Sequence, residues 1–141
     1  RVDVACVVTD LDGEPHLSNA AREGVPFIVH AHGDNTKTWR KCIDRWATSG
    51  GPRLVLTHQT DEAIPGMHNP GGFTDGDRAA CFLSWLDVPP EKIRWAGFAT
   101  DRVGPWSGTT DPQRKLAKLS WMERVLRCID ARWDERCLEN R

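Results

Sequence analysis

The sequence lacks several features that would assign it to common protein classes. No stretch approaches the ~20 consecutive apolar residues that a membrane-spanning helix needs. No basic segment precedes an apolar run, so we expect no signal peptide. The 19 Lys and Arg residues nearly balance the 20 Asp and Glu residues, for a net charge of -1. That balance gives no overall field to attract nucleic acid or anionic lipid, so we expect neither as a partner.

Cysteine pairs are also missing. The five cysteines are an odd number, and none of them lies in a C-x-x-C pair. This pattern argues against a zinc knuckle and against a disulfide framework, and it favours a reducing, cytoplasmic environment.

Four apolar stretches predict β-strands, at 4–11, 26–32, 53–57 and 93–99. They lack polar alternation, which is typical of parallel strands covered on both faces. With 141 residues and 39% hydrophobic residues, the chain is expected to form one domain over 1–141. Because the chain begins with Arg1 and enters a predicted strand almost at once, we expect a fragment that lacks earlier strands.

Helical patterns lie between the predicted strands. Trp39, Ile43 and Trp46 form one apolar stripe, which Asn35 or Thr36 can cap. A second helix is predicted to begin after Thr74. The last begins at Asp111-Pro112, and its stripe comprises Leu116, Leu119, Met122, Leu126, Ile129 and Trp133. Alternating strands and helices predict an α/β fold.

The first predicted strand ends in the acidic sequence Asp10-Leu11-Asp12-Gly13. Alternate residues of a strand share a face, so both carboxylates can point at one ion. Magnesium commonly takes one or two protein carboxylates together with substrate phosphates. The alternative is a plain acidic turn, since Asp is common in turns.

The second predicted strand ends in His30-Ala31-His32-Gly33-Asp34-Asn35. Asp34 is a candidate metal ligand, and His30 or His32 is a candidate contact for phosphate or a ring. The alternative makes the histidines hydrogen-bonded core groups and Asn35 a helix cap. With His58 and His68, a histidine-rich zinc site stays a minor alternative.

A third polar segment, 71–78, opens a predicted helix with Thr74, Asp75 and Asp77. Its alternative is a capping box between Thr74 and Asp77. Capping leaves Gly76 unexplained, because glycine weakens a first turn. We therefore predict that Asp75 and Asp77 join the metal site. The backbone at Gly72 can approach a phosphate, and Arg78 can clamp it.

Two further candidates come from placement alone. Gln59 follows the third strand and could line the same cleft, although a solvated loop explains it equally well. Lys115 lies in the first turns of the last helix, where cations are least favoured, which indicates phosphate contact. A solvated basic face is the alternative.

Together, V-V-T-D-L-D-G, H-A-H-G-D-N and G-G-F-T-D-G-D-R-A resemble, in this order, the archaeal 6-hydroxymethyl-7,8-dihydropterin diphosphokinase family. That family is distantly related to the thiamine pyrophosphokinase catalytic domain. The resemblance implies a three-layer, Rossmann-like α/β fold with a mostly parallel sheet. It implies a cytoplasmic enzyme that transfers diphosphate from ATP to the hydroxymethyl group of a reduced pterin and uses Mg²⁺. A homo-oligomer is compatible with this prediction.

The resemblance also implies roles for individual residues. Its metal and phosphate-site acids fall on Asp10, Asp12, Asp34, Asp75 and Asp77. Among these, Asp12, Asp34 and Asp77 are the candidates for catalysis, with Asp34 the first choice for the base. It implies ligand contacts at Asn35, Thr74 and Arg78. The residue patterns described above add four candidate ligand contacts: His32, Gln59, Gly72 and Lys115.

Three rival functions stay open. A D-x-D-G motif after an apolar strand also begins haloacid-dehalogenase-type phosphatases, in which Asp10 would be the nucleophile. Segment 30–35 has no place in that scheme. The chain could instead be a nucleotide-binding module without activity, or a diphosphokinase that acts on thiamine, since fold does not fix substrate.

Overall fold

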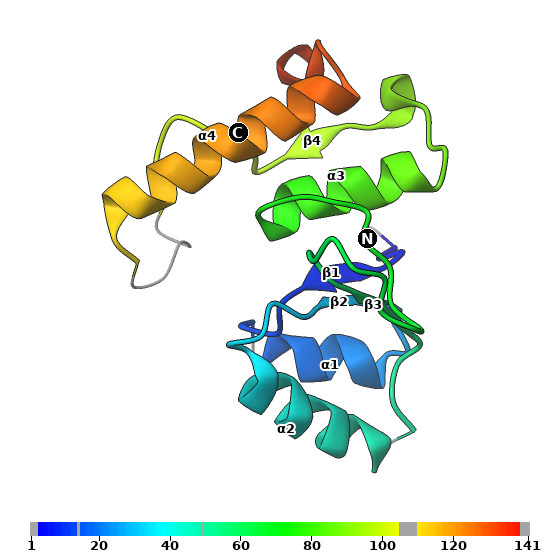
Figure 1. Ribbon diagram of the computed structural model, residues 1–141. Helices are drawn as coiled ribbons and strands as arrows, with labels where there is room; N and C mark the ends of the chain where they lie inside the picture. Colours follow the sequence, from blue (N-terminus) through cyan, green and yellow to red (C-terminus); the bar gives the residue numbers. More distant parts are fainter. Residues whose placement is uncertain (1–2, 14, 49, 105–109, 139–141) are drawn as a thin grey trace. The chain divides into compact units, whose positions relative to one another are not determined.

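The computed structural model describes the chain except for residues 1–2, 14, 49, 105–109 and 139–141 (Figure 1). The chain forms two compact units, Arg1–Asn69 and Pro70–Arg141. We describe each unit by itself, so the expectation of a single domain over 1–141 stays a prediction. Within the described residues, no helix has the length and apolarity needed to cross a membrane.

The first unit is built on a parallel sheet. Its strands are β1 (Val7–Thr9), β2 (Phe27–His30) and β3 (Leu54–Thr57), in the order β1-β2-β3. Helix α1 (His16–Arg22) connects β1 to β2, and α2 (Thr36–Ala47) connects β2 to β3. Parallel neighbours need such crossover connections, so the predicted α/β class with a parallel sheet is confirmed.

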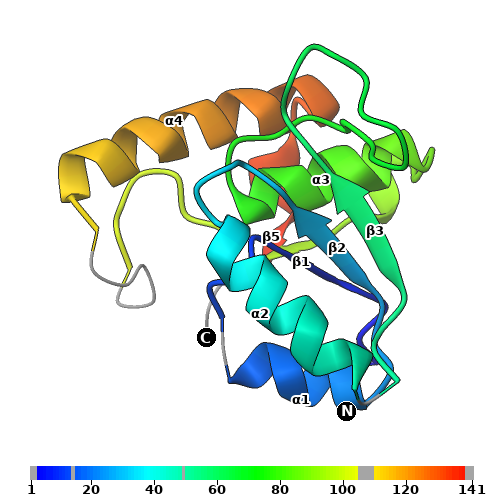
Figure 2. The same cartoon turned by 60° about the horizontal axis from the view of Figure 1, so that its bottom comes forward.

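The core of the first unit lies between the sheet and its two helices. Figures 1 and 2 show α1 and α2 on the same side of the sheet. Every residue of β2 is buried, and the rings of Phe27 and Trp46 lie 4.8 Å apart. Truncating either ring to alanine is expected to cost about 3–5 kcal/mol. The buried core residues are Leu11, Leu17, Ala21, Phe27, Val29, Cys42 and Trp46.

The second unit packs two long helices against a small parallel sheet (Figure 1). Its helices are α3 (Asp75–Trp85) and α4 (Pro112–Ile129), and its sheet pairs β4 (Trp95–Ala96) with β5 (Cys137–Leu138). Among its described residues, 3-10 turns lie at Pro90–Lys92 and Trp133–Arg136. The core comprises Ala80, Ile93, Trp95, Leu119, Met122, Leu126 and Trp133.

Several predicted boundaries need correction. All four predicted strands exist but are shorter than their apolar stretches, and the fourth belongs to the separate β4-β5 sheet. Helix α1 was not predicted, because only Leu17 and Ala21 of its seven residues are buried and they form no clear apolar stripe. Helix α4 ends at Ile129 because Asp130 leaves helical geometry, with φ -146° and ψ 104°. Trp133 is buried from the following 3-10 turn.

Candidate functional site

The acidic pair in the first unit lies in a turn directly after β1. Leu11, between the two aspartates, has φ +74° and is almost fully buried. Its N–H donates to the Thr9 hydroxyl at 2.9 Å. A left-handed leucine costs roughly 1–2 kcal/mol, and such strain is found where function or packing requires it. The predicted strand alternation therefore ends at Thr9, and the turn at Leu11 sets the positions of Asp10 and Asp12.

His32 brings two of the predicted acids together. Its Nε2 lies 3.2 Å from Asp10 Oδ2, and its Nδ1 forms an ion pair with Asp34. The Asp34 side chain is largely exposed, whereas the Asp10 side chain is 28% exposed. Asp10 Oδ1 is buried and has no hydrogen-bond partner among the described residues. One carboxylate oxygen of Asp10 is thus held by His32, and the other is left for a ligand.

Asn35 has a use that the sequence did not reveal. It is the N-cap residue of α2, but its side chain does not cap the helix. Its Nδ2 donates to the carbonyl oxygens of Asp10 at 3.0 Å and His30 at 2.9 Å, and its Oδ1 accepts from the N–H of His32 at 3.4 Å. The amide therefore ties the ends of β1 and β2 together. Its predicted contact with a ligand stays a prediction.

Two other histidines of the first unit, His30 and His58, have ordinary hydrogen-bond partners. His30 is buried, with Nδ1 3.1 Å from Thr57 Oγ1 and Nε2 3.4 Å from Gln59 Oε1. Gln59 therefore lies beside the strand ends, as expected, but contacts His30. His58 Nδ1 lies 2.9 Å from Thr60 Oγ1. In the part of the chain that the structure describes, no histidine joins a group of three metal ligands, so the zinc alternative lacks support.

In the second unit, the capping box at the start of α3 is present. Asp77 is fully buried, and its carboxylate accepts from Phe73 N at 2.7 Å, from Thr74 N at 2.6 Å and from the Thr74 hydroxyl. These bonds satisfy backbone donors that a helix start leaves unpaired. The structure thus gives Thr74 and Asp77 a structural role. Their predicted ligand roles stay predictions.

Asp75 differs from Asp77 in its surroundings. Its side chain is 39% exposed, and its Oδ1 lies 3.5 Å from Arg78 Nη1. Arg78 is buried and also donates from Nη2 to the carbonyl oxygen of Gly72 at 3.4 Å. The predicted phosphate clamp therefore faces Asp75 and the loop backbone. Asp75 is the more accessible of the two acids at this helix start.

Two glycines of the segment 71–78, Gly72 and Gly76, have packing reasons. Gly72 has φ +101°, and an added Cβ would lie 2.6 Å from Arg78 Cα, so only glycine fits. At Gly76 an added Cβ would lie 3.1 Å from the Phe98 ring. Gly76, which capping left unexplained, thus lets Phe98 pack against the first turn of α3.

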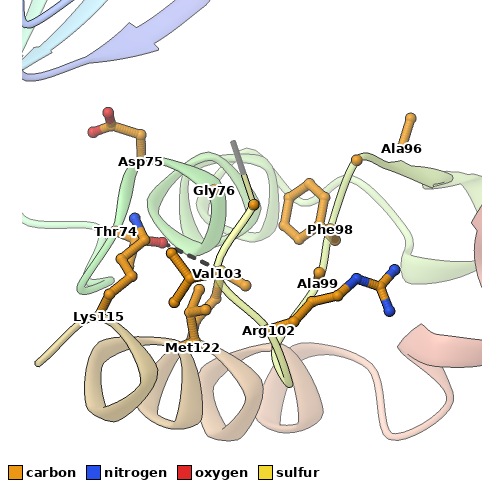
Figure 3. A pocket seen from close by; sticks show the side chains of 13 residues that line it. Thr74, Asp75, Gly76, Ala96, Phe98, Ala99, Arg102, Val103, Lys115 and Met122 are labelled. Carbon is orange, nitrogen blue, oxygen red and sulfur yellow. Dashed lines mark hydrogen bonds between the residues drawn. The ribbon is translucent and has the colours of Figure 1, made fainter. Parts of the chain in front are cut away.

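A pocket of about 480 Å³ opens beside this turn (Figure 3). Three parts of the second unit form it: the start of α3, the segment 96–104, and residues 115–122 of α4. Predicted residues Thr74, Asp75 and Lys115 line it. Sequence reasoning missed Phe98, Arg102 and Met122, because no motif marks the segment 96–104. The lining residues are Thr74, Asp75, Gly76, Ala96, Gly97, Phe98, Ala99, Arg102, Val103, Gly104, Lys115, Leu119 and Met122.

Comparison with curated proteins identifies relatives that share one name, 6-hydroxymethyl-7,8-dihydropterin pyrophosphokinase. The protein from Methanothermobacter thermautotrophicus is 32% identical over 142 residues, covering 92% of this chain and 56% of its own length. The protein from Pyrococcus furiosus is 42% identical over 128 residues, covering 85% of this chain and 51% of its own length. Over most of its length the chain is similar to this pyrophosphokinase family. The predicted family resemblance is therefore confirmed.

A third member of the pyrophosphokinase family, from Methanocaldococcus jannaschii, is 36% identical over 80 residues, covering 56% of this chain and 32% of its own length. The chain spans about half the length of the first two relatives. No family model matches the sequence. No solved structure matches it either.

Proposed function

We propose that this chain carries part or all of a Mg²⁺-dependent pterin diphosphokinase activity. The reaction would transfer diphosphate from ATP to 6-hydroxymethyl-7,8-dihydropterin and release AMP. The observation that carries this proposal is the shared name of three relatives that are 32–42% identical to it. Because the chain spans about half of the first two, the activity of a whole family member is proposed for it, not established.

The first unit has residues that fit a magnesium ion. Asp10 presents a buried oxygen, Oδ1, that accepts no hydrogen bond from the described residues. Asp12 follows two residues later, and Asp34 lies on the other side of His32. Hard cations such as Mg²⁺ prefer carboxylate oxygens, and one or two suffice when phosphates supply others. We propose Asp10 and Asp12 as the main ligands. Participation of Asp34, Asp75 and Asp77 in this ion site stays a prediction.

The proposed chemistry asks for positioning and charge neutralisation. The hydroxymethyl oxygen forms a bond to the β-phosphorus of ATP. The bond between that phosphorus and the oxygen that links it to the α-phosphorus breaks, and AMP leaves with that oxygen. The hydroxyl proton passes to a base, for which we propose the exposed carboxylate of Asp34. A bound Mg²⁺ would neutralise phosphate charge. His32 and Asn35 hold the carboxylate and backbone of Asp10 in place.

The proposed partners are ATP and a reduced pterin, and the proposed location is the cytoplasm. The proposed location rests on the cysteine pattern, an odd number of cysteines without a C-x-x-C pair. Thiamine stays an alternative acceptor. Because the net charge is -1, we do not propose nucleic acid as a partner. The oligomeric state stays open.

Nucleotide analysis tests the proposal. The chain is incubated with ATP, Mg²⁺ and the reduced pterin, and AMP should form only when the pterin is present. EDTA should stop AMP formation, and excess Mg²⁺ should restore it. Asp10→Asn should lose at least about 100-fold in rate, since it weakens charge neutralisation in the transition state. Release of free phosphate without pterin would instead support the phosphatase alternative with Asp10 as nucleophile. ATP binding without any turnover would support a binding module.

A further inference from the structure

The pocket of the second unit divides into two chemically different parts. Its floor is apolar, with Phe98, Leu119 and Met122. Its rim is polar and carries Thr74 together with two cations, Arg102 and Lys115. Ligand pockets of a few hundred Å³ commonly combine an apolar floor with a few polar groups that fix orientation. The volume of about 480 Å³ is large enough for a drug-sized ligand.

Both cations of the rim are available to an anion. Lys115 forms no ion pair with any residue that the structure describes, and it lies in the first turn of α4. A cation there is disfavoured by its own helix dipole, so the fold gains nothing from its charge. In Figure 3 its side chain extends from α4 toward the end of the pocket that Thr74 lines. Arg102 pairs only loosely with Asp101, at 3.7 Å, and both side chains are more than 70% exposed.

The floor offers a flat and preformed surface. The Phe98 ring packs against the first turn of α3 where Gly76 has no side chain. Its other neighbour is the Trp95 ring, edge to face at a centroid distance of 5.3 Å. Figure 3 shows the side chains of Phe98 and Met122, which form part of this floor. A planar ring gains stacking and burial energy on such a surface without reordering it.

Among the lining residues that the structure describes, Asp75 is the only acid. Its carboxylate lies 3.5 Å from the Arg78 guanidinium, which offsets its charge. The two lining cations therefore outweigh the acid, and the pocket favours a ligand that carries negative charge.

We propose that this pocket binds a planar nitrogen heterocycle that carries a diphosphate. The ring lies against Phe98 and Met122, and the diphosphate contacts Lys115 at the end of the pocket that Thr74 lines. This inference rests on the proposed function for the choice of ligand, because a nucleotide and a pterin diphosphate share this chemistry. Binding here requires no turnover, so it can be tested separately.

The test measures binding to the full chain by calorimetry in the presence of EDTA, which excludes metal bridging. The probes are ADP, 6-hydroxymethylpterin diphosphate, inorganic diphosphate and unphosphorylated 6-hydroxymethylpterin. Lys115→Ala should weaken binding of the better heterocyclic diphosphate by about ten-fold, the usual effect of one charge-assisted contact. Lys118→Ala is the matched control, because Lys118 is exposed on the same helix and does not line the pocket. It should change binding less than two-fold.

A second pair of variants tests the ring. Ala99→Phe adds a ring at the pocket wall without removing any core side chain, and it should weaken the heterocyclic diphosphate by more than ten-fold while sparing inorganic diphosphate. Ala117→Phe, on the exposed surface of α4, is its control and should have no effect. Circular dichroism confirms folding of each variant.

The outcomes are distinct. Tighter binding of ADP identifies the source as a nucleotide, and tighter binding of 6-hydroxymethylpterin diphosphate identifies it as the pterin product; both support the pocket. Unchanged affinities in folded Lys115→Ala and Ala99→Phe would overturn it, as would equal binding of inorganic diphosphate and the heterocyclic diphosphates. If binding follows these variants but no AMP forms in the turnover assay, the pocket stands and the proposed function fails.

Discussion

Asp75 and Asp77 lie two residues apart, but substitution by asparagine should mainly lower stability at Asp77 and mainly lower activity at Asp75. We predict that Asp77→Asn destabilises the chain, because the buried carboxylate accepts hydrogen bonds from Phe73 N and Thr74 N on separate oxygens. An amide keeps one acceptor oxygen and turns an NH₂ group toward the other donor. One buried N–H then has no acceptor, whichever way the amide is oriented.

The expected loss follows from two contributions. A hydrogen bond to a charged group contributes about 1.5–3 kcal/mol. A negative charge at a helix N-terminus contributes about 0.3–1 kcal/mol. The free energy of unfolding should therefore fall by about 2–4 kcal/mol, which moves a urea midpoint by about 1–2 M at an m-value near 2 kcal/mol/M. Asp75→Asn alters a 39% exposed side chain, and we expect a loss of about 1 kcal/mol or less.

The assay is urea unfolding followed by circular dichroism, with hydrogen exchange of the α3 amides as a local measure. Exchange at the start of α3 should accelerate in Asp77→Asn and stay near the wild-type rate in Asp75→Asn. AMP formation, measured where both variants are folded, should decline more in Asp75→Asn. An Asp77→Asn variant with wild-type stability and lost activity would refute the capping assignment and restore Asp77 as a ligand group.

Three further predictions concern packing, the strand ends and thiol chemistry. Gly72→Ala should lower the free energy of unfolding by about 2–4 kcal/mol, because the added Cβ would clash with the backbone of Arg78 at a positive φ. Gly97→Ala is the control: it has φ +76° but open space around it, and it should lose only about 1 kcal/mol in the same urea experiment. Asn35→Ala should lose about 1–3 kcal/mol and speed hydrogen exchange at the end of β2, and Asn35→Asp, which lacks the N–H donors, should not rescue it. Burial, and then the charge of Asp77, raises the pKa of Cys81 to about 11. An unfolded thiol ionises near 9.0, so stability should fall as pH rises from about 9 to about 11, and alkylation of Cys81 should lag that of exposed Cys128 at pH 8.

The strands of the first unit could be predicted from the sequence, because they lie in uninterrupted runs of apolar residues. Phe27, Ile28 and Val29 of β2 are all buried, and a run of that kind has few other uses. Helix α1 was not predicted, because two buried residues among seven do not form a recognisable apolar stripe. The pairing of β4 with β5 could not be predicted either, because a strand of two residues has no detectable periodicity.

Side-chain partners were harder to predict than elements. Sequence position placed Asn35 beside the first turn of α2, where asparagine commonly caps a helix. Its actual acceptors, the carbonyl oxygens of Asp10 and His30, lie 25 and 5 residues away along the chain. Phe98 and Arg102 gave no signal at all, because a pocket wall is assembled by tertiary packing. Gly76 was the exception, since a glycine in a first turn is a visible anomaly that Phe98 explains.

A capping carboxylate and a ligand carboxylate occupy the same place in a sequence, because both suit the positive end of a helix. What separates Asp77 from Asp75 is the number of acceptor sites already used. Both Asp77 oxygens accept bonds from the loop that precedes α3, in a position without solvent. The Asp75 oxygen is 3.5 Å from one guanidinium and partly exposed. A ligand that competes for Asp77 must break hydrogen bonds that hold the helix start, whereas one that contacts Asp75 needs only to loosen an ion pair. On that energetic difference we predict that, of these two acids, Asp75 and not Asp77 is the one that contacts a ligand.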